Sequence, residues 1–216
     1  MLDIRNCDCM DLMKEYPDKH FELAIVDPPY GIGDIRDGGH DVNRSINKYK
    51  TVSWNNQIPS KQYFDEVNRV SKSRIIWGCQ YYSKYLRDDE VGRIIHDKDI
   101  SMSTISQADI ASCSFHKRVR VFKYKWHGFI KAGDSPFDHQ RIHPCEKPVS
   151  LYEWLLTNYA KKGDKILDTH GGSMSIAIAA WNLGFDLTLC ELDKDYYDAA
   201  MKRITFHQAQ KQLFKP

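Results

Sequence analysis

The sequence contains no hydrophobic run long enough to cross a membrane, and residues 1–10 lack the apolar core of a secretory signal. We therefore expect a cytoplasmic protein with no membrane partner. Six cysteines are present, but they are scattered, and only Cys7 and Cys9 lie close together. A structural zinc site needs a second close pair or a Cys/His cluster, and a disulfide framework needs an exported chain. We therefore predict neither a metal site nor disulfides.

Internal repeats are also absent, and a net charge of +2 is small for a protein that binds nucleic acid through its overall charge. The distribution of charge is more informative. Residues 110–133 contain no Asp or Glu, yet they contain six Lys or Arg with five aromatic residues between them. This pattern suits contact with phosphates and stacking on bases, but it equally suits an edge strand protected by lysines.

What the sequence does contain is an alternation of short apolar strands and amphipathic helices within 216 residues, enough for one domain. Strands are predicted at 21–26, 74–77, 91–96, 119–125, 165–167 and 186–190. Helices are predicted at 59–71, 81–86, 148–159, 175–183 and 196–207, and loops at 31–57 and 132–145. The alternation indicates an α/β fold, with a mostly parallel sheet and helices on both faces.

Polar signatures follow three of the predicted strands, where ligands bind in such sheets. Asp168, Gly171 and Gly172 lie between a strand and a helix, where glycines permit close backbone approach to a ligand. Glu191 ends the next strand about 20 residues later, a spacing suited to holding ribose hydroxyls. These residues indicate an adenosine-type cofactor, either a nicotinamide dinucleotide or S-adenosylmethionine.

The third signature, Asp27-Pro28-Pro29-Tyr30, separates these two cofactors. An aryl amine is a poor nucleophile, and the Asp27 carboxylate with the Pro28 carbonyl can accept its two hydrogens. Consecutive prolines stiffen the turn and donate no competing N–H group. The Tyr30 ring can stack on a flipped base, which is worth about 1–3 kcal/mol. An ordinary proline turn explains the two prolines but not Asp27 and Tyr30 beside them after a buried strand.

Asp27-Pro28-Pro29-Tyr30 matches the catalytic motif of DNA amino-methyltransferases, and the sequence resembles their beta group, in which this motif precedes the cofactor loop. The resemblance extends over most of the chain and is strongest to small phage and prophage adenine methyltransferases. It implies one Rossmann-like S-adenosylmethionine-dependent methyltransferase domain over residues 1–216, with circularly permuted motifs and a small target-recognition insertion at 100–140. The implied function is site-specific methylation of the 6-amino group of adenine in double-stranded DNA, by a monomer or homodimer in a bacterial or phage-infected cell.

The resemblance also assigns site residues one by one. It gives the catalytic role to Asp27, Pro28, Pro29 and Tyr30. It places the residues from Ile76 to Gly78 beside the target pocket. No metal is implied. The cofactor-binding residues that it implies are Asp8, Cys9, Asp27, His143, Lys147, Asp168, His170, Gly171, Gly172, Ser173 and Glu191.

The sequence departs from the family pattern at three positions. Met174 stands where the cofactor loop of the wider family ends in glycine, and His170 replaces an aromatic residue. His96 stands where relatives usually carry Trp. If the backbone at Met174 must approach the cofactor closely, we expect weakened binding of the cofactor.

Three other functions stay open. They are methylation of the 4-amino group of cytosine, DNA binding with weakened catalysis, and nicotinamide-dependent oxidation, which leaves the Asp-Pro-Pro-Tyr motif unexplained.

Overall fold

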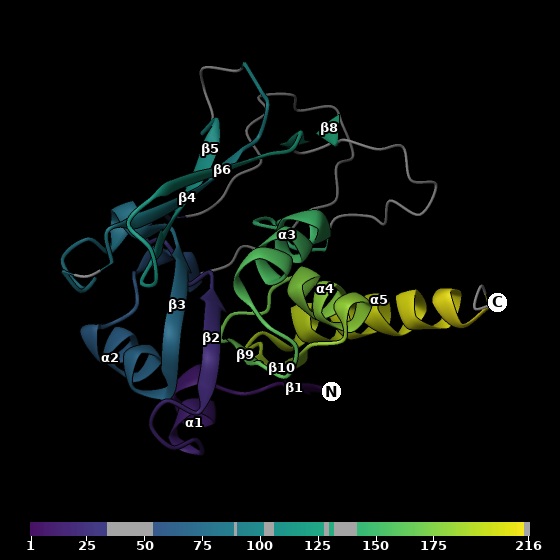
Figure 1. Cartoon of the computed structure of the whole chain (residues 1–216). Coiled ribbons are helices and arrows are strands. Elements are labelled where there is room, and N and C mark those ends of the chain that lie inside the picture. Colours follow the sequence, from purple (N-terminus) through teal and green to yellow (C-terminus); the bar gives the residue numbers. More distant parts are fainter. Residues whose placement is uncertain (34–53, 89, 102–105, 128–129, 132–141, 214–216) are drawn as a thin grey trace.

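The computed structural model describes residues 1–33, 54–88, 90–101, 106–127, 130–131 and 142–213 (Figure 1). Eight strands form one sheet in the order β1-β10-β9-β2-β3-β5-β4-β6. Their bounds are β1 Leu2–Arg5, β2 Phe21–Val26, β3 Ser71–Trp77, β4 Gly92–Asp97, β5 Ala108–Cys113, β6 Val119–Lys123, β9 Lys165–Asp168 and β10 Asp186–Cys190. A separate pair consists of β7 Trp126–His127 and β8 Ile130–Lys131. The helices are α1 Cys9–Lys14, α2 Lys61–Val70, α3 Val149–Tyr159, α4 Ser175–Leu183 and α5 Lys194–Leu213, with short 3-10 turns η1 Trp54–Asn56 and η2 Cys79–Tyr81.

The five strands from β1 to β3 in this order are all parallel to their neighbours. Beyond β3, β5 is the strand that runs in the opposite direction, antiparallel to both β3 and β4. β6 is parallel to β4. The prediction of a mostly parallel sheet is therefore confirmed. The carboxyl ends of the parallel strands meet at one edge of the sheet, where the polar signatures follow them.

Both faces of the central strands are buried. Along β2, Leu23 and Ile25 contribute to the core shared with α3, α4 and α5, whereas Ala24 and Val26 contribute to the core shared with α1 and α2. This alternation follows from the two-residue period of a strand, and it explains why β2 is apolar at nearly every position. In Figure 1, α1 and α2 lie on one side of β2 and β3, and α3, α4 and α5 lie on the other. The prediction of helices on both faces is confirmed.

The predicted strands and helices are largely found, with several differences. β1, α1, β5, the short pair β7 and β8, and the turn η1 were not predicted. The predicted helix at 81–86 is wrong: the chain forms only η2 and then turns, because Tyr82 is fully buried with its hydroxyl on the Pro28 and Pro29 carbonyls. Most of the predicted loop at 31–57, and residues 132–141 of the second loop, lie outside the described residues.

The basic segment, residues 110–133, covers the end of β5 and all of β6, β7 and β8. β5 lies inside the sheet, whereas β6 forms its edge, with Val119 and Val121 exposed. The edge-strand interpretation is confirmed for residues 119–123. Within the described ranges, no helix is both long and apolar enough to span a membrane.

Candidate functional site

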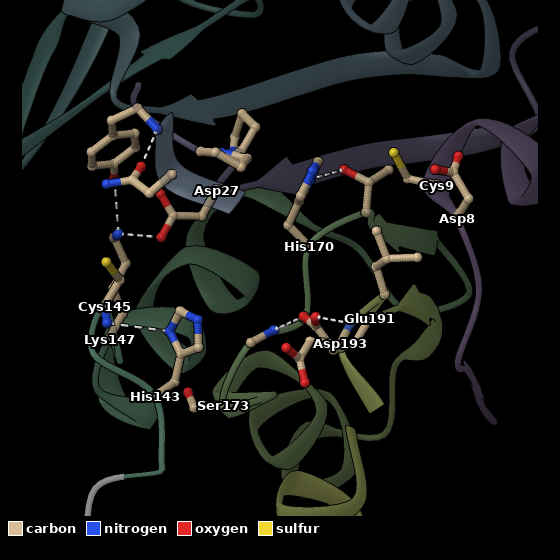
Figure 2. A pocket seen from close by; sticks show the side chains of 18 of the residues that line it. Asp8, Cys9, Asp27, His143, Cys145, Lys147, His170, Ser173, Glu191 and Asp193 are labelled. Atoms are coloured by element: carbon tan, nitrogen blue, oxygen red, sulfur yellow. Dashed lines mark hydrogen bonds and ion pairs between the residues drawn. The ribbon is translucent and has the colours of Figure 1, made fainter. Parts of the chain in front are cut away.

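One cavity of about 570 Å³ opens where the parallel strands end (Figure 2). Four of its lining segments follow β1, β2, β9 and β10, and another precedes α3; Asn55 of η1 and Tyr152 of α3 complete the lining. The lining residues are Cys7, Asp8, Cys9, Asp27, Pro28, Pro29, Tyr30, Asn55, His143, Cys145, Lys147, Tyr152, Thr169, His170, Gly171, Gly172, Ser173, Glu191, Leu192 and Asp193. Every predicted site residue except Asp168 therefore lies at this one cavity, although the segments are far apart in the sequence.

Asp27 lies at one end of the cavity, with both carboxylate oxygens engaged. The Tyr30 hydroxyl donates to Oδ1 at 2.6 Å, and the Lys147 ammonium donates to Oδ2 at 2.5 Å. The Tyr30 backbone N–H donates to the Asn55 side-chain carbonyl at 2.9 Å, which fixes the turn after Pro29. The motif therefore presents its acid and its aromatic ring as one hydrogen-bonded unit.

The prolines of the motif leave their carbonyls available as acceptors. The Tyr82 hydroxyl lies 2.5 Å from the Pro28 oxygen and 2.7 Å from the Pro29 oxygen and donates to this pair. The Pro28 carbonyl, which we predicted to accept a hydrogen from the target amine, thus already has a protein partner. A carbonyl oxygen has two lone pairs, so a second donor can share it.

The ring of Tyr30 is held by its neighbours. It stacks on Tyr81 with ring centroids 5.0 Å apart and an interplanar angle of 18°. Gly78 lies against its edge, and a Cβ atom there would stand 2.3 Å from the ring. Gly78 also has a φ of +73°, a conformation that glycine adopts without strain. This strand end, which we expected beside the target pocket, therefore contacts the ring of Tyr30 directly.

Glu191 organises the opposite end of the cavity. Its carboxylate accepts the Gly172 backbone N–H at 2.7 Å and the Asp193 backbone N–H at 2.8 Å. Burial raises the pKa of this carboxyl above its ordinary value. A Cβ atom at Gly171 would stand 2.6 Å from the Leu189 side chain, so a larger residue does not fit there. Glu191 therefore holds the glycine loop that follows β9 against the end of β10. Figure 2 shows Glu191 well separated from Asp27 and Lys147.

Two departures from the family pattern have a structural explanation. Met174 is fully buried in the core, adopts a φ of +54° and does not line the cavity. The close approach of its backbone to the cofactor, which we considered from the sequence, therefore has no counterpart among the lining residues. The His170 ring nitrogen lies 2.9 Å from the Thr169 hydroxyl, which the Tyr63 hydroxyl contacts at 2.7 Å. Burial lowers the pKa of His170 to about 4, so its ring is neutral at pH 7.

Asp168 does not line the cavity and is only 2% exposed. Its Oδ1 accepts the His170 backbone N–H at 3.0 Å. Burial raises the pKa of Asp168 to about 7, despite that hydrogen bond. Its predicted contact with the cofactor stays a prediction.

The family model described as DNA methylase, of the N6_N4 methyltransferase type, matches residues 76–202, more than half of the chain. The chain belongs to this family of DNA methylases. The DNA adenine methyltransferase YhdJ of Escherichia coli is 21% identical over 96% of this chain and 85% of its own length. The Type II methyltransferase M.HpaI of Haemophilus parainfluenzae is 24% identical over 89% of this chain and 70% of its own length.

Solved structures share the fold of this methylase. The PvuII DNA methyltransferase, named as cytosine-N4-specific, superposes with a TM-score of 0.64 at 11% identity, covering 97% of this chain and 92% of its own. The M1.HpyAVI complex with S-adenosylmethionine superposes with a TM-score of 0.57 at 16% identity, covering 94% of this chain and all of its own. The predicted S-adenosylmethionine-dependent methyltransferase fold is confirmed.

The methylase uses S-adenosylmethionine, and the cavity suits that cofactor. The cofactor carries a positive sulfonium and a positive amino group, and four carboxylates line the cavity: Asp8, Asp27, Glu191 and Asp193. Among the described lining residues, Lys147 is the only Lys or Arg, and it is paired with Asp27. The lining carboxylates therefore attract the positive groups of the cofactor, and Asp27 neutralises the charge of Lys147.

Several lining residues were not predicted. They are Cys7, Asn55, Cys145, Tyr152, Thr169, Leu192 and Asp193. Most of them adjoin a predicted residue and follow from its position once the strand ends are known. Asn55 and Tyr152 carry no local signal, because each reaches the cavity from a segment whose sequence shows no ligand-binding pattern. Among the described residues, no group of three or more His, Cys, Asp or Glu has an arrangement that could hold a metal ion.

Proposed function

We propose that this DNA methylase transfers a methyl group to the 6-amino group of adenine in double-stranded DNA, at a specific sequence. The observation that carries the proposal is the Asp27–Tyr30 unit, with the Asp27 carboxylate and the Tyr30 ring at the same cavity as the cofactor loop. The similarity to YhdJ, which is named as a DNA adenine methyltransferase, supports adenine as the target.

In this proposal the catalytic residues are Asp27, Pro28, Pro29 and Tyr30. S-adenosylmethionine supplies an activated methyl group on its positive sulfonium. Asp27 would accept a hydrogen bond from the target amine and stabilise the positive charge that the nitrogen gains as it takes the methyl group from the sulfonium; one proton then leaves the nitrogen for solvent. The Pro28 carbonyl accepts the second hydrogen, and Tyr30 stacks on the flipped base. The protein contributes position and electrostatics and needs no covalent nucleophile.

The cofactor-binding residues in this proposal are those predicted from the sequence: Asp8, Cys9, Asp27, His143, Lys147, Asp168, His170, Gly171, Gly172, Ser173 and Glu191. Glu191 would hold the ribose hydroxyls, because its oxygens face the cavity and retain lone pairs beyond those used by the backbone N–H groups. Asp168 does not line the cavity, so it would act on the cofactor amino group indirectly, through the loop whose His170 backbone N–H it accepts.

We further propose that residues 1–216 form a single domain and that residues 100–140 read the target sequence. In the described part of that region, β6 and the residues flanking it offer Lys117, Arg118, Arg120, Lys123 and Lys125 at an edge of the sheet. Such side chains suit phosphate contacts, which would position the DNA so that other residues of this region can reach the bases.

Transfer of radiolabelled methyl groups from S-adenosylmethionine to unmethylated duplex DNA tests the proposal. Asp27→Asn, which keeps the side-chain shape but removes the charge, should lower the transfer rate by about 100-fold or more. Asp198→Asn makes the same chemical change on an exposed face of α5 and should leave the rate unchanged. Wild-type transfer by Asp27→Asn would refute the catalytic role of Asp27.

The 4-amino group of cytosine is a second candidate target, because the PvuII enzyme named as cytosine-N4-specific has the same fold. The chemistry at Asp27 would be the same, since both targets are exocyclic aryl amines. Digestion of the methylated DNA to nucleosides, followed by mass spectrometry, distinguishes the two: 6-methyladenine supports the proposal, and 4-methylcytosine replaces it with the second candidate.

A further inference from the structure

The cofactor loop ends in a residue whose backbone conformation its side chain disfavours. Met174 has a φ of +54° and a ψ of +33°, in the left-handed region that residues other than glycine rarely adopt. Its backbone N–H donates to the Gly171 carbonyl at 2.7 Å, so the turn encloses Gly172 and Ser173, which line the cavity. The conformation at Met174 therefore decides where these two lining residues stand.

Arg203 of α5 donates hydrogen bonds to both neighbours of Met174. Its Nη1 atom lies 2.9 Å from the Ser173 carbonyl oxygen and 3.1 Å from the Ser175 hydroxyl oxygen. Both serines are buried, and the Arg203 side chain is only 8% exposed. Hydrogen bonds from a cation are stronger than those between neutral groups, and burial strengthens them further. One guanidinium nitrogen therefore fixes the disfavoured residue from both sides.

The other terminal nitrogen of Arg203 faces a second segment of the cavity wall. Its Nη2 atom lies 3.9 Å from Glu146 Oε1, and the Glu146 side chain is fully buried. Glu146 directly precedes Lys147, which lines the cavity. Its Oε2 accepts the Ile142 backbone N–H at 3.3 Å, and its backbone carbonyl accepts the Trp126 indole N–H at 2.7 Å. Glu146 is therefore held in place, and it anchors the guanidinium.

The same two segments meet inside the cavity. A Cβ atom at Gly172 would stand only 3.3 Å from the His143 ring, so the loop and the residues before α3 are in contact there. Figure 2 shows His143 and Ser173 close together at this point. A change in the turn at Met174 would alter the spacing between the two segments, and with it the space that the cofactor enters.

We propose that Arg203 is a positioning residue for the cofactor, holding the turn at Met174 in the conformation that binds S-adenosylmethionine. Glycine adopts this φ without strain, whereas methionine needs contacts that offset the strain. Without those contacts the turn spends part of its time in other conformations, and the apparent Kd rises in inverse proportion to the fraction that can bind. The inference concerns the cofactor alone and depends neither on Asp27 nor on the target base.

Isothermal titration calorimetry of Arg203→Met with S-adenosylmethionine tests the inference. Methionine keeps an unbranched apolar side chain in the core and removes every N–H donor. The Kd should rise about tenfold, which corresponds to a turn that is competent to bind about a tenth of the time. The double variant Arg203→Met/Met174→Gly should bind at least about threefold more tightly than Arg203→Met, because glycine adopts the turn without the guanidinium.

An arginine that only stabilises the fold predicts a different pattern, in which Arg203→Met unfolds at a lower temperature but binds the cofactor with a Kd within about twofold of wild type. That result would overturn the inference, and so would a double variant that binds no more tightly than Arg203→Met. Arg69→Met is the matched control. Arg69 also donates to backbone carbonyls, those of Met13 and Tyr16, but neither residue lines the cavity, so its Kd should equal that of wild type.

If Arg203→Met does not fold, Ser175→Ala replaces it in the comparison. This change removes one of the two acceptors of the Arg203 Nη1 atom and deletes only one oxygen atom, so it disturbs the core little. The Kd for S-adenosylmethionine should rise about threefold, and adding Met174→Gly should reverse the rise. A wild-type Kd for Ser175→Ala would contradict the role of Arg203. Thermal unfolding of each variant confirms that the Kd values are compared between folded proteins.

Discussion

Asp168→Asn should make the protein more stable at high pH, because the buried carboxyl resists ionisation. Asp168 is 2% exposed, and burial raises its pKa to about 7 from an ordinary value of 3.8. A raised pKa means that the folded protein binds the proton more tightly than the unfolded chain. The stability from this group is therefore complete below about pH 3.8 and is lost as the pH rises through 7.

The size of the effect follows from the two pKa values. Because of this pKa difference, Asp168 lowers the free energy of unfolding by about 4 kcal/mol at pH 8 and by about 1 kcal/mol at pH 4.5. The amide oxygen of Asn can still accept the His170 backbone N–H, so the variant keeps that hydrogen bond. Asp168→Asn should therefore gain about 3 kcal/mol over wild type between these two pH values.

Urea unfolding at pH 4.5 and pH 8, followed by circular dichroism, measures this difference. Asp198→Asn is the matched control, because its carboxylate is exposed on α5 and pairs with Lys194, and it should follow the wild-type pH dependence. Equal pH dependence for Asp168→Asn and wild type would show that Asp168 is ionised in the folded protein, and the account of its burial would be wrong.

Three further substitutions test individual contacts. Gly78→Ala should cost about 2–4 kcal/mol in unfolding free energy and slow methyl transfer, because its Cβ atom would stand 2.3 Å from the Tyr30 ring at a φ of +73°; an unchanged rate would contradict this. Glu90→Gln should cost about 3–5 kcal/mol by urea unfolding, because it leaves the buried Arg74 unpaired; a loss below 1 kcal/mol would count against it. Met174→Gly should cost about 2 kcal/mol, the lost burial exceeding the relieved backbone strain, with a Kd for S-adenosylmethionine within about threefold of wild type by calorimetry.

The accuracy of the sequence predictions varied with the burial of each element. β2, α4 and β10 have the predicted bounds, because apolar runs buried on both sides leave a strong pattern that ends at Asp, Gly or Glu. β1 was missed because it has only four residues, all only partly buried, at the edge of the sheet. β5 was missed because its small and polar residues form a strand only between β3 and β4.

In the candidate site, too, part of the arrangement follows from the sequence and part from tertiary packing. The sequence by itself determined which residue types follow the strands, and the parallel sheet brings them to one cavity because all its carboxyl ends meet at one edge. The tertiary structure alone decided how those residues are paired. Lys147 and Asp27 are 120 positions apart, and no local pattern joins them. Charge pairing and burial depend on distances across the sheet, and these are fixed only when the whole core packs.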